Sequence, residues 1–219
     1  MAKNLSFCII GLGRFGTHLA LSLASQNYHV MAIDKDRRKL DLLAEDITDL
    51  AAFDASNERL LHESGAANFD VAVVCFSKNV SDSILATIAL KSLGVEKVVT
   101  RAGSDQHRLV LEKIGADGII YPEHDMAEKV AFELANTKIL SHMEFAEGHS
   151  TDEIPVPGSW IGKSLRELDI RNNFKVNVVA VKHGESVTMV TDPDEKFRAG
   201  DFLVVAGKTE RIRSLANLK

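Results

Sequence analysis

Few features of this sequence point to disulfide stabilisation, membrane insertion or nucleic-acid binding. The two cysteines among its 219 residues, Cys8 and Cys75, lie in apolar stretches, where thiols most often pack as small hydrophobic groups. No apolar run approaches the ~20 residues that cross a bilayer, and residues 1–6 lack the basic and apolar segments of a signal peptide. A net charge of −5 gives no basic footprint. We therefore expect a cytoplasmic protein with no nucleic-acid partner.

The motifs of common catalytic sites are also missing. The sequence holds no P-loop, no HExxH and no Ser/His/Asp nucleophile motif. A dehydrogenase needs a proton-transfer group near the nicotinamide and a domain that holds its substrate. His107 and His124 are the histidines nearest to the expected cleft, and neither has an orienting carboxylate at a known catalytic spacing. We therefore expect a binding protein that is not an enzyme, with a small NAD-dependent oxidoreductase as the alternative.

Apolar runs alternate with amphipathic segments over the first 120 residues. Runs without polar alternation, such as residues 71–74, are typical of strands buried on both faces. Strands that alternate with helices indicate βαβ units and a parallel sheet. The expected strands are Leu5–Ile10, His29–Ile33, Asp49–Phe53, Asp70–Phe76, Lys97–Arg101 and Gly118–Tyr121. The pattern predicts an α/β fold with a Rossmann-like, doubly wound parallel sheet.

A second, smaller domain is expected after a long helix over residues 125–140. Met126, Val130 and Leu134 form one apolar stripe on that helix, which either covers the sheet or crosses to a partner subunit. We expect a nucleotide-binding domain over residues 1–140, a polar linker over residues 141–150 and a small α+β domain over residues 151–219. The elements expected in that last domain are strands at Val176–Lys182, Ser186–Val190 and Asp201–Ala206 and a helix at Lys208–Leu215.

The sequence Gly-Leu-Gly-Arg-Phe-Gly fits the dinucleotide-binding pattern G-x-G-x-x-G, directly after an apolar strand and before a helix. Gly11 permits the tight turn, Gly13 lets a phosphate approach the backbone, and Gly16 lets the helix lie close to the strand. The phosphates would then meet the free N–H groups at the helix start. Asp34 ends the second strand, where a carboxylate accepts hydrogen bonds from ribose hydroxyls and repels the 2′-phosphate of NADP.

Other strand ends supply further candidates, because ligands of open parallel sheets sit beyond the carboxyl ends of the strands. Asp54 is expected near the adenosine, with an N-terminal turn of the next helix as the alternative. Ser77 is placed near the phosphates or ribose, with helix capping as the alternative, and Arg101 is either a phosphate partner or an exposed charge. The full set of additional cofactor-binding candidates is Phe15, Lys35, Asp54, Ala55, Phe76, Ser77 and Arg101.

Two segments closely resemble bacterial potassium-transport regulatory subunits of the KtrA/TrkA type. One is the strand and glycine loop at Ile9–Gly16, and the other is Lys113–Met126, which contains Ile-Gly-Ala-Asp and Pro-Glu-His-Asp-Met. Segments at Gly162–Leu165, Leu168–Arg171 and Ala199–Val205 resemble the C-terminal domain of the same family. The resemblance covers nearly the whole chain. It implies an N-terminal RCK (KTN) nucleotide-binding domain and a small RCK C-terminal domain.

This resemblance also implies a function. Family members form cytosolic rings, typically octamers built from homodimers, beneath a separate K⁺-translocating membrane subunit of the KtrB/TrkH kind. ATP and ADP compete for the cleft, NAD(H) binds in some members, and ATP favours the conducting state. By this resemblance, Arg14 reaches the γ-phosphate that ADP lacks, which would distinguish the two ligands. The alternative for Arg14 is an exposed charge at the start of a helix.

The resemblance suggests two further ligand sites. Glu123 matches a family acid that takes part in binding a divalent cation, Mg²⁺ or Ca²⁺, near the triphosphate, with a helix N-terminal charge as the alternative. In some relatives the C-terminal domain binds cyclic di-AMP through an Asp-x-Arg element. Asp169 and Arg171 match that element, with an ion pair between them as the alternative. Leu165 and Pro193 are the apolar contacts. Lys175 stands where relatives often carry glycine, which alters the turn.

Overall fold

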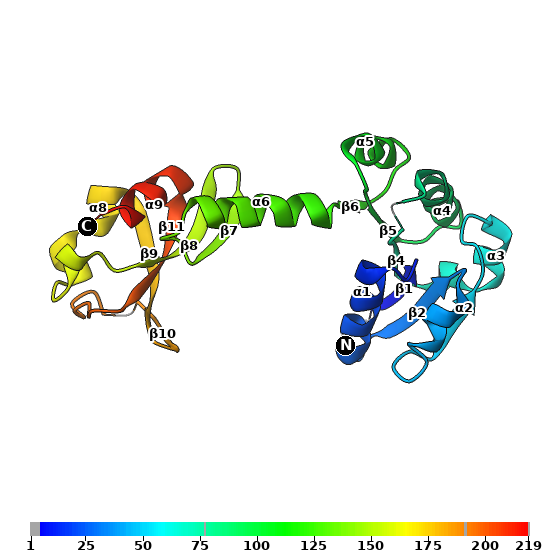
Figure 1. Cartoon of the computed structure of the whole chain (residues 1–219), viewed down its shortest axis with the longest axis horizontal. Helices are drawn as coiled ribbons and strands as arrows, with labels where there is room; N and C mark the ends of the chain where they lie inside the picture. The colour runs from blue at the N-terminus through cyan, green and yellow to red at the C-terminus, as the bar shows by residue number, and fades with distance from the viewer. Residues whose placement is uncertain (1–4, 77, 191, 219) are drawn as a thin grey trace. The chain divides into compact units, whose positions relative to one another are not determined.

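The computed structural model describes residues 5–76, 78–190 and 192–218, and the chain divides into two compact units, Met1–Pro122 and Glu123–Lys219 (Figure 1). Each unit has its own sheet and its own hydrophobic core. Within the described ranges, no helix combines the length and the apolar character that a bilayer crossing requires.

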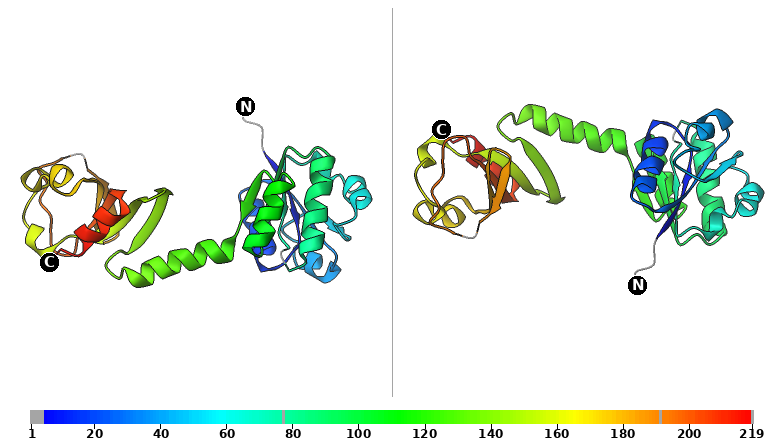
Figure 2. Two further views of the ribbon diagram at one scale, coloured as in Figure 1. Left: turned by 90° about the horizontal axis from the view of Figure 1, so that it is seen from above. Right: turned by 90° about the horizontal axis from the view of Figure 1, so that it is seen from below.

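The first unit is a parallel six-stranded sheet with helices on both faces (Figure 2). The strand order is β3-β2-β1-β4-β5-β6, and every neighbouring pair is parallel. This is the Rossmann order, and it confirms the expected fold. The strands are β1 (Ser6–Ile10), β2 (His29–Asp34), β3 (Asp49–Ala52), β4 (Val71–Val74), β5 (Lys97–Arg101) and β6 (Gly118–Ile120). The helices are α1 (Arg14–Ser25), α2 (Arg37–Asp41), α3 (Glu58–Glu63), η1 (Ala66–Asn68), α4 (Val80–Ser92) and α5 (Asp105–Lys113).

Most helices of this unit begin at a polar cap. The side chain of Asn57 accepts hydrogen bonds from the first turn of α3, as Asn79 does for α4 and Ser104 for α5. Helix α1 differs, because its cap is Gly13 and no side chain bonds to its first turn. The exception lies at the glycine loop.

The second unit is an antiparallel five-stranded sheet in the order β10-β9-β11-β8-β7. Its strands are β7 (Ser141–Ala146), β8 (His149–Pro155), β9 (Val176–His183), β10 (Ser186–Met189) and β11 (Phe202–Lys208). Its helices are α6 (Pro122–Ala135), which starts at the last residue of the first unit, η2 (Gly158–Trp160), α7 (Leu165–Leu168), α8 (Ile170–Phe174) and α9 (Thr209–Ala216). The strands and closing helix expected after residue 175 agree with β9, β10, β11 and α9 to within about two residues.

The expected polar linker at residues 141–150 differs from the structure. Residues 141–146 form β7, which pairs antiparallel with β8 and adds an edge to the second sheet. The compact units also meet at residue 122 rather than 140, so α6 belongs largely to the second unit. Hydropathy did not reveal this hairpin because two of the three buried positions of β8 hold polar residues, Ser150 and Asp152.

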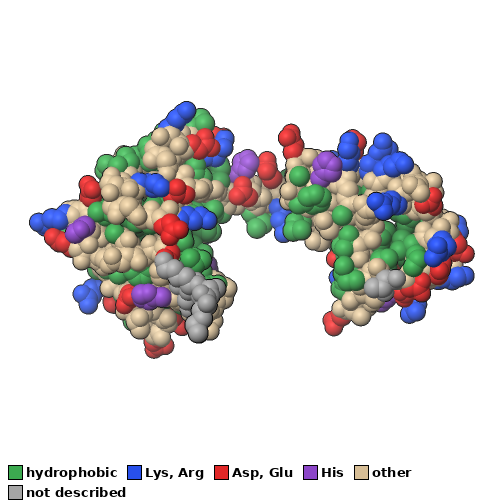
Figure 3. Space-filling view, turned by 180° about the vertical axis from the view of Figure 1, so that it is seen from behind, with side chains coloured by type: hydrophobic (Ala, Val, Ile, Leu, Met, Phe, Trp, Pro, Cys, Tyr) green, Lys and Arg blue, Asp and Glu red, His purple; other side chains and the backbone are tan. Residues whose placement is uncertain are grey.

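Apolar side chains also reach the surface of both units, and Figure 3 shows such groups on one face. In the first unit they lie on the neighbouring helices α4 and α5, where the side chains are Leu85, Ile88, Leu109 and Val110. In the second unit they lie on α6, around β7 and on β10. The predicted stripe on α6 is exposed there, with exposed fractions of 57% for Met126, 42% for Val130 and 74% for Leu134.

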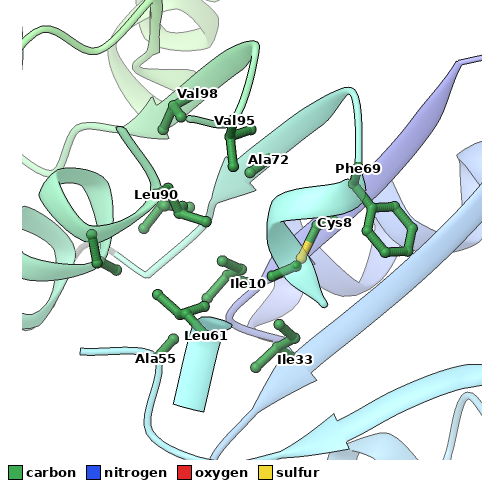
Figure 4. Close-up of a cluster of buried hydrophobic side chains, with 14 residues drawn as sticks. Cys8, Ile10, Ile33, Ala55, Leu61, Phe69, Ala72, Leu90, Val95 and Val98 are labelled. Atoms are coloured by element: carbon green, nitrogen blue, oxygen red, sulfur yellow. The ribbon is translucent and has the colours of Figure 1, made fainter. Parts of the chain in front are cut away.

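The core of the first unit has one cluster on each face of the sheet. Figure 4 shows the cluster beneath α3 and α4, where Ile10 and Ile33 from the strands meet Leu61 and Leu90 from the helices. The other cluster packs α1 and α2 against the opposite face. With both faces covered, the open ends of the strands are the places left for a ligand.

Candidate functional site

The glycine loop joins β1 to α1 at the carboxyl edge of the parallel sheet. Two backbone groups tie it to the neighbouring strand β2. The Gly11 N–H donates to the Ile33 carbonyl at 2.7 Å, and the Leu12 N–H donates to Oδ2 of Asp34 at 2.7 Å. These two hydrogen bonds fix the loop against the end of β2.

The three glycines of the loop have different surroundings. Gly11 has a φ of +93°, and a Cβ there would lie 2.7 Å from Cδ1 of Phe76. A Cβ at Gly16 would lie 2.1 Å from the Gly11 carbonyl oxygen, so only glycine lets the helix approach the loop this closely. At Gly13, a Cβ would have no neighbour within 4 Å. The loop is crowded beneath Gly11 and Gly16 and open at Gly13, where a phosphate would approach.

The first turn of α1 offers a site for an anion. Its leading N–H groups have no partner within the helix, and neither a side-chain cap nor an acidic residue neutralises them. Arg14, the first residue of the helix, is exposed and makes no ion pair in the part of the chain that the structure describes. Backbone donors, helix dipole and guanidinium are thus available to phosphate oxygens.

Asp34 lies where the sequence predicted it, at the end of β2, and its side chain is 7% exposed. Its Oδ2 accepts hydrogen bonds from Leu12 N–H and from Lys39 Nζ, the latter at 2.9 Å, while Oδ1 accepts from Asp36 N–H at 2.8 Å. A carboxylate has about four acceptor positions, so capacity remains on Oδ1. Asp34 therefore shapes the glycine loop as well as being the candidate ribose acceptor.

Lys39 is a site neighbour that the sequence analysis missed. It lies on α2, five residues after Asp34, and its side chain is 42% exposed. The only signal in the sequence is a basic residue within reach on the helix after β2. If a nucleotide occupies the site as the sequence predicts, a lysine so placed would compete with its ribose for Asp34 or add a positive charge beside its phosphates.

Arg101, at the end of β5, lies close to Phe15, in the first turn of α1. The Arg101 guanidinium carbon lies 5.8 Å from the Phe15 ring centroid, and Nη1 donates to the Cys75 carbonyl at 3.4 Å. Phe76 lies beside Gly11, because its ring occupies the space that a Cβ at position 11 would need. Three of the additional candidates, Phe15, Phe76 and Arg101, thus border the glycine loop or its helix.

The third strand end is organised by a turn. The Asp54 carboxylate accepts hydrogen bonds from the backbone and side chain of Ser56, which hold the pKa of Asp54 below its usual value with a smaller contribution from the charge of Lys35. Ala55 as a whole is 5% exposed and packs in the core, so its side chain is not available to a ligand. Ser77 lies outside the described residues.

Models of two protein domains match the chain, the TrkA-N domain over residues 7–122 and the TrkA-C domain over residues 152–219. Ktr system potassium uptake protein C of Bacillus subtilis (strain 168) is 37% identical over 206 residues, which are 94% of this chain and 93% of that protein. The chain belongs to the Ktr/TrkA family. Ktr system potassium uptake protein A of the same strain is 32% identical over 215 residues, covering 98% of this chain and 97% of that protein.

A solved structure described as the GsuK channel bound to NAD aligns with 99% of the chain at a TM-score of 0.64 and 17% identity. The chain spans 40% of the length of that channel chain. At this identity the likeness shows the fold alone, and it agrees with the two-unit architecture of the Ktr/TrkA chain.

In the TrkA-C part, the candidate ligand residues lie around α7 and α8. Asp169 has a φ of +44°, and both of its carboxylate oxygens accept from the Asn172 side chain at 2.9 and 3.1 Å. Among the described residues, Asp169 and Arg171 do not form the ion pair that was the alternative reading. The Pro193 carbonyl accepts from the Arg166 N–H, and Leu165 borders a small cavity beside β9 and β10. Lys175 adopts a left-handed backbone at the end of α8, with a φ of +58°.

The other titratable candidates are structural or exposed. His107 is buried, its Nδ1 accepts from the Gly103 N–H, and burial lowers its pKa. His124 is half exposed near Asp125 and Glu128, at 3.5 and 3.6 Å. Burial raises the pKa of Cys75 to about 12 and that of Cys8 further, which supports the prediction that both thiols are packing groups.

Metal ligands are sparse in the described ranges, where no three His, Cys, Asp or Glu side chains gather as a metal site would require. Glu123 is the first residue of the second unit and lies in the first turn of α6. A cation that bridges nucleotide phosphates takes few protein ligands. The role of Glu123 therefore stays a prediction.

Proposed function

We propose that this chain is a nucleotide-sensing regulatory subunit of a K⁺ uptake system, which controls a separate membrane translocator of the KtrB/TrkH kind from the cytoplasm. The observation that carries the proposal is the open first turn of α1, with Gly13 unobstructed and Arg14 unpaired within the described residues, beside Asp34 at the end of β2. Family membership supports a role in K⁺ transport, because two relatives that match this chain over 93% and 97% of their own length are named potassium uptake proteins.

The switching ligands in this proposal are ATP and ADP. A change of state requires a ligand to contact the two states differently. The γ-phosphate is the group by which ATP exceeds ADP, and Arg14 is an exposed cation at the first position of the helix that follows the glycine loop. NAD(H) is a further candidate, since a protein of the same fold is described as bound to NAD. A Mg²⁺ or Ca²⁺ ion held partly by Glu123 would accompany ATP.

Assembly and a second ligand complete the proposal. Exposed apolar side chains on α6 and on α4 with α5 supply two surfaces through which homodimers could form and join into an octameric ring. Cyclic di-AMP is the candidate ligand of the TrkA-C domain, at Leu165, Asp169, Arg171 and Pro193. Lys175 keeps the left-handed turn in this region, which supports an intact site.

The decisive experiment titrates the purified chain with ATP, ADP, NADH and cyclic di-AMP while its mass in solution is followed. We expect ATP and ADP to compete for one site per chain on an oligomer whose hydrodynamic size depends on which is bound. A chain that stays monomeric and unchanged with either nucleotide would refute the proposal. A parallel assay for hydride transfer with nicotinamide cofactors tests the oxidoreductase alternative, for which we expect no turnover.

A further inference from the structure

Helix α6 is poorly anchored for a helix of 14 residues. None of its residues is buried, and its apolar stripe faces outward. Phe132 is the apolar side chain of its C-terminal half that is only half exposed and packs against the second core cluster. An isolated helix of this length is marginally stable in water, so its C-terminal end is fixed by the contact at Phe132 together with the buried Ile139 that follows the helix.

The Phe132 ring is held by two side chains. The His142 imidazole stacks on it with the centroids 3.5 Å apart and the planes inclined by 15°. The Arg213 guanidinium lies over the same ring, 4.7 Å from its centroid. Stacking and cation–π attraction both require an aromatic face, so an aliphatic residue of similar volume would not replace this contact.

Both holding side chains are fixed to the second sheet. Nδ1 of His142 lies 2.6 Å from Oδ1 of Asp152, whose side chain is fully buried. Oδ2 of Asp152 accepts from the Ser150 hydroxyl at 3.1 Å, and Ser150 accepts from the Thr209 hydroxyl at 3.1 Å. Thr209 begins α9, the helix that also carries Arg213. A continuous chain of hydrogen bonds therefore joins the two sides of the clamp.

We infer that this clamp, formed by Phe132, His142 and Arg213, is a conformational latch that makes α6 move as one body with the TrkA-C unit. The contact edges a groove of about 520 Å³ that is also lined by β7, the β7–β8 turn and the start of α9. The latch thus lies at an accessible surface. Given the proposed function, a change at the nucleotide site reaches the second unit through this latch.

Hydrogen–deuterium exchange of the full chain tests the latch. In Phe132→Leu and Arg213→Met, we expect the amides of residues 128–137 to exchange at least fivefold faster than in the wild type, with β11 unchanged. Phe132→Tyr keeps the aromatic face and should behave as the wild type. Phe145→Leu is the matched control, because Phe145 is exposed and lies 6.3 Å from His149 at a 46° tilt. Unchanged exchange in Phe132→Leu, or equal acceleration in β11, overturns the latch.

A second measurement separates this inference from the proposed function. ATP should alter exchange in β7 and α9 of the wild type, and Phe132→Leu should lose this response while its ATP affinity stays within twofold. If the wild type binds no nucleotide, the proposed function fails and the first experiment still decides the latch. If the Leu variant binds ATP and responds fully, the latch does not transmit the signal and the inference is wrong.

Discussion

Arg14 is the residue on which we expect the discrimination between ATP and ADP to depend. Its guanidinium is exposed and, within the described residues, unpaired, at the start of a helix whose first N–H groups are uncapped. Charge-assisted hydrogen bonds contribute roughly 1.5–3 kcal/mol each, so Arg14→Ala should weaken ATP by roughly tenfold or more and ADP by less than threefold. Calorimetric titration measures both affinities, with the exposed Arg37→Ala as the control. Equal losses for ATP and ADP would remove Arg14 from the γ-phosphate.

Asp34 holds the glycine loop and is also the residue that we expect to bind the ribose; a variant of its neighbour Lys39 separates these two roles. Asp34→Ala removes the ribose acceptor and the bond to the Leu12 N–H, so we expect every adenosine ligand to weaken by about 1–3 kcal/mol. Lys39→Met leaves the bond to the loop intact and frees one acceptor position on Oδ2. If Lys39 competes with the ribose, this variant binds adenosine as well as or better than the wild type. Unchanged affinity in Asp34→Ala would contradict the placement of the ribose.

Lys175 adopts a left-handed backbone, with φ +58° and ψ 35°, at the end of α8. A side chain in this region costs about 1 kcal/mol or more, which glycine avoids while making the unfolded chain more flexible. Lys175→Gly should therefore raise the free energy of unfolding by about 0.5 kcal/mol. The single tryptophan, Trp160, is buried beside Phe174 and reports unfolding of this unit by fluorescence. Lys175→Ala retains Cβ and should show no gain; a gain equal to that of glycine would exclude backbone strain as the cause.

At the scale of elements, Asp117 ties three segments of the first unit together just before β6. Its carboxylate accepts from Lys91 on α4 at 2.8 Å and from the Val98 N–H of β5 at 2.7 Å. These hydrogen bonds, that of Lys91 first, lower the pKa of Asp117 below its ordinary 3.8. A lowered folded-state pKa means that the stabilisation is complete above that ordinary value and is lost as pH falls through the folded pKa.

Asp117→Asn should therefore destabilise the first unit at pH 7 and much less near pH 2–3, below the ordinary carboxyl pKa. Because the side chain is 34% exposed, solvent screening limits the expected loss to about 0.5–1 kcal/mol. Urea unfolding followed by circular dichroism at the two pH values measures the difference, with the exposed Asp46→Asn as the control. A loss independent of pH would show that the charge of Asp117 is not its cause.

The parallel sheet could be predicted because its strands are apolar on both faces and its helices carry polar caps, so local pattern and tertiary environment agree. The β7–β8 hairpin could not. Its buried positions include Asp152, which depends on His142 of the paired strand, a relation that no local pattern contains. The candidate site divides in the same way. The glycine loop and Asp34 follow from a short motif, whereas Lys39 and the contact between Phe15 and Arg101 exist only after elements distant in sequence are brought together.

At the scale of the whole molecule, the two exposed apolar surfaces are the contacts through which we propose that copies of the chain assemble. One lies on α4 and α5 of the first unit, and the other lies on α6 of the second. A stable interface buries roughly 800 Å² on each partner and excludes unpaired charge from its centre. Since the surfaces are on different units, a ring built from dimers would use each for a different contact.

Glutamate substitutions at the two surfaces should therefore give different, smaller assemblies. Val130→Glu on α6 and Leu109→Glu on α5 each place a charge within one apolar surface. We expect each variant to form only dimers, through the surface that it leaves unchanged. The double variant should be monomeric. Leu42→Glu is the control, because Leu42 is 82% exposed at the end of α2 and belongs to neither surface. Light scattering measures the masses, and ADP affinity checks that each variant is folded. A single variant that retains the wild-type mass would show that its surface is not an assembly contact, and the ring would then require other residues.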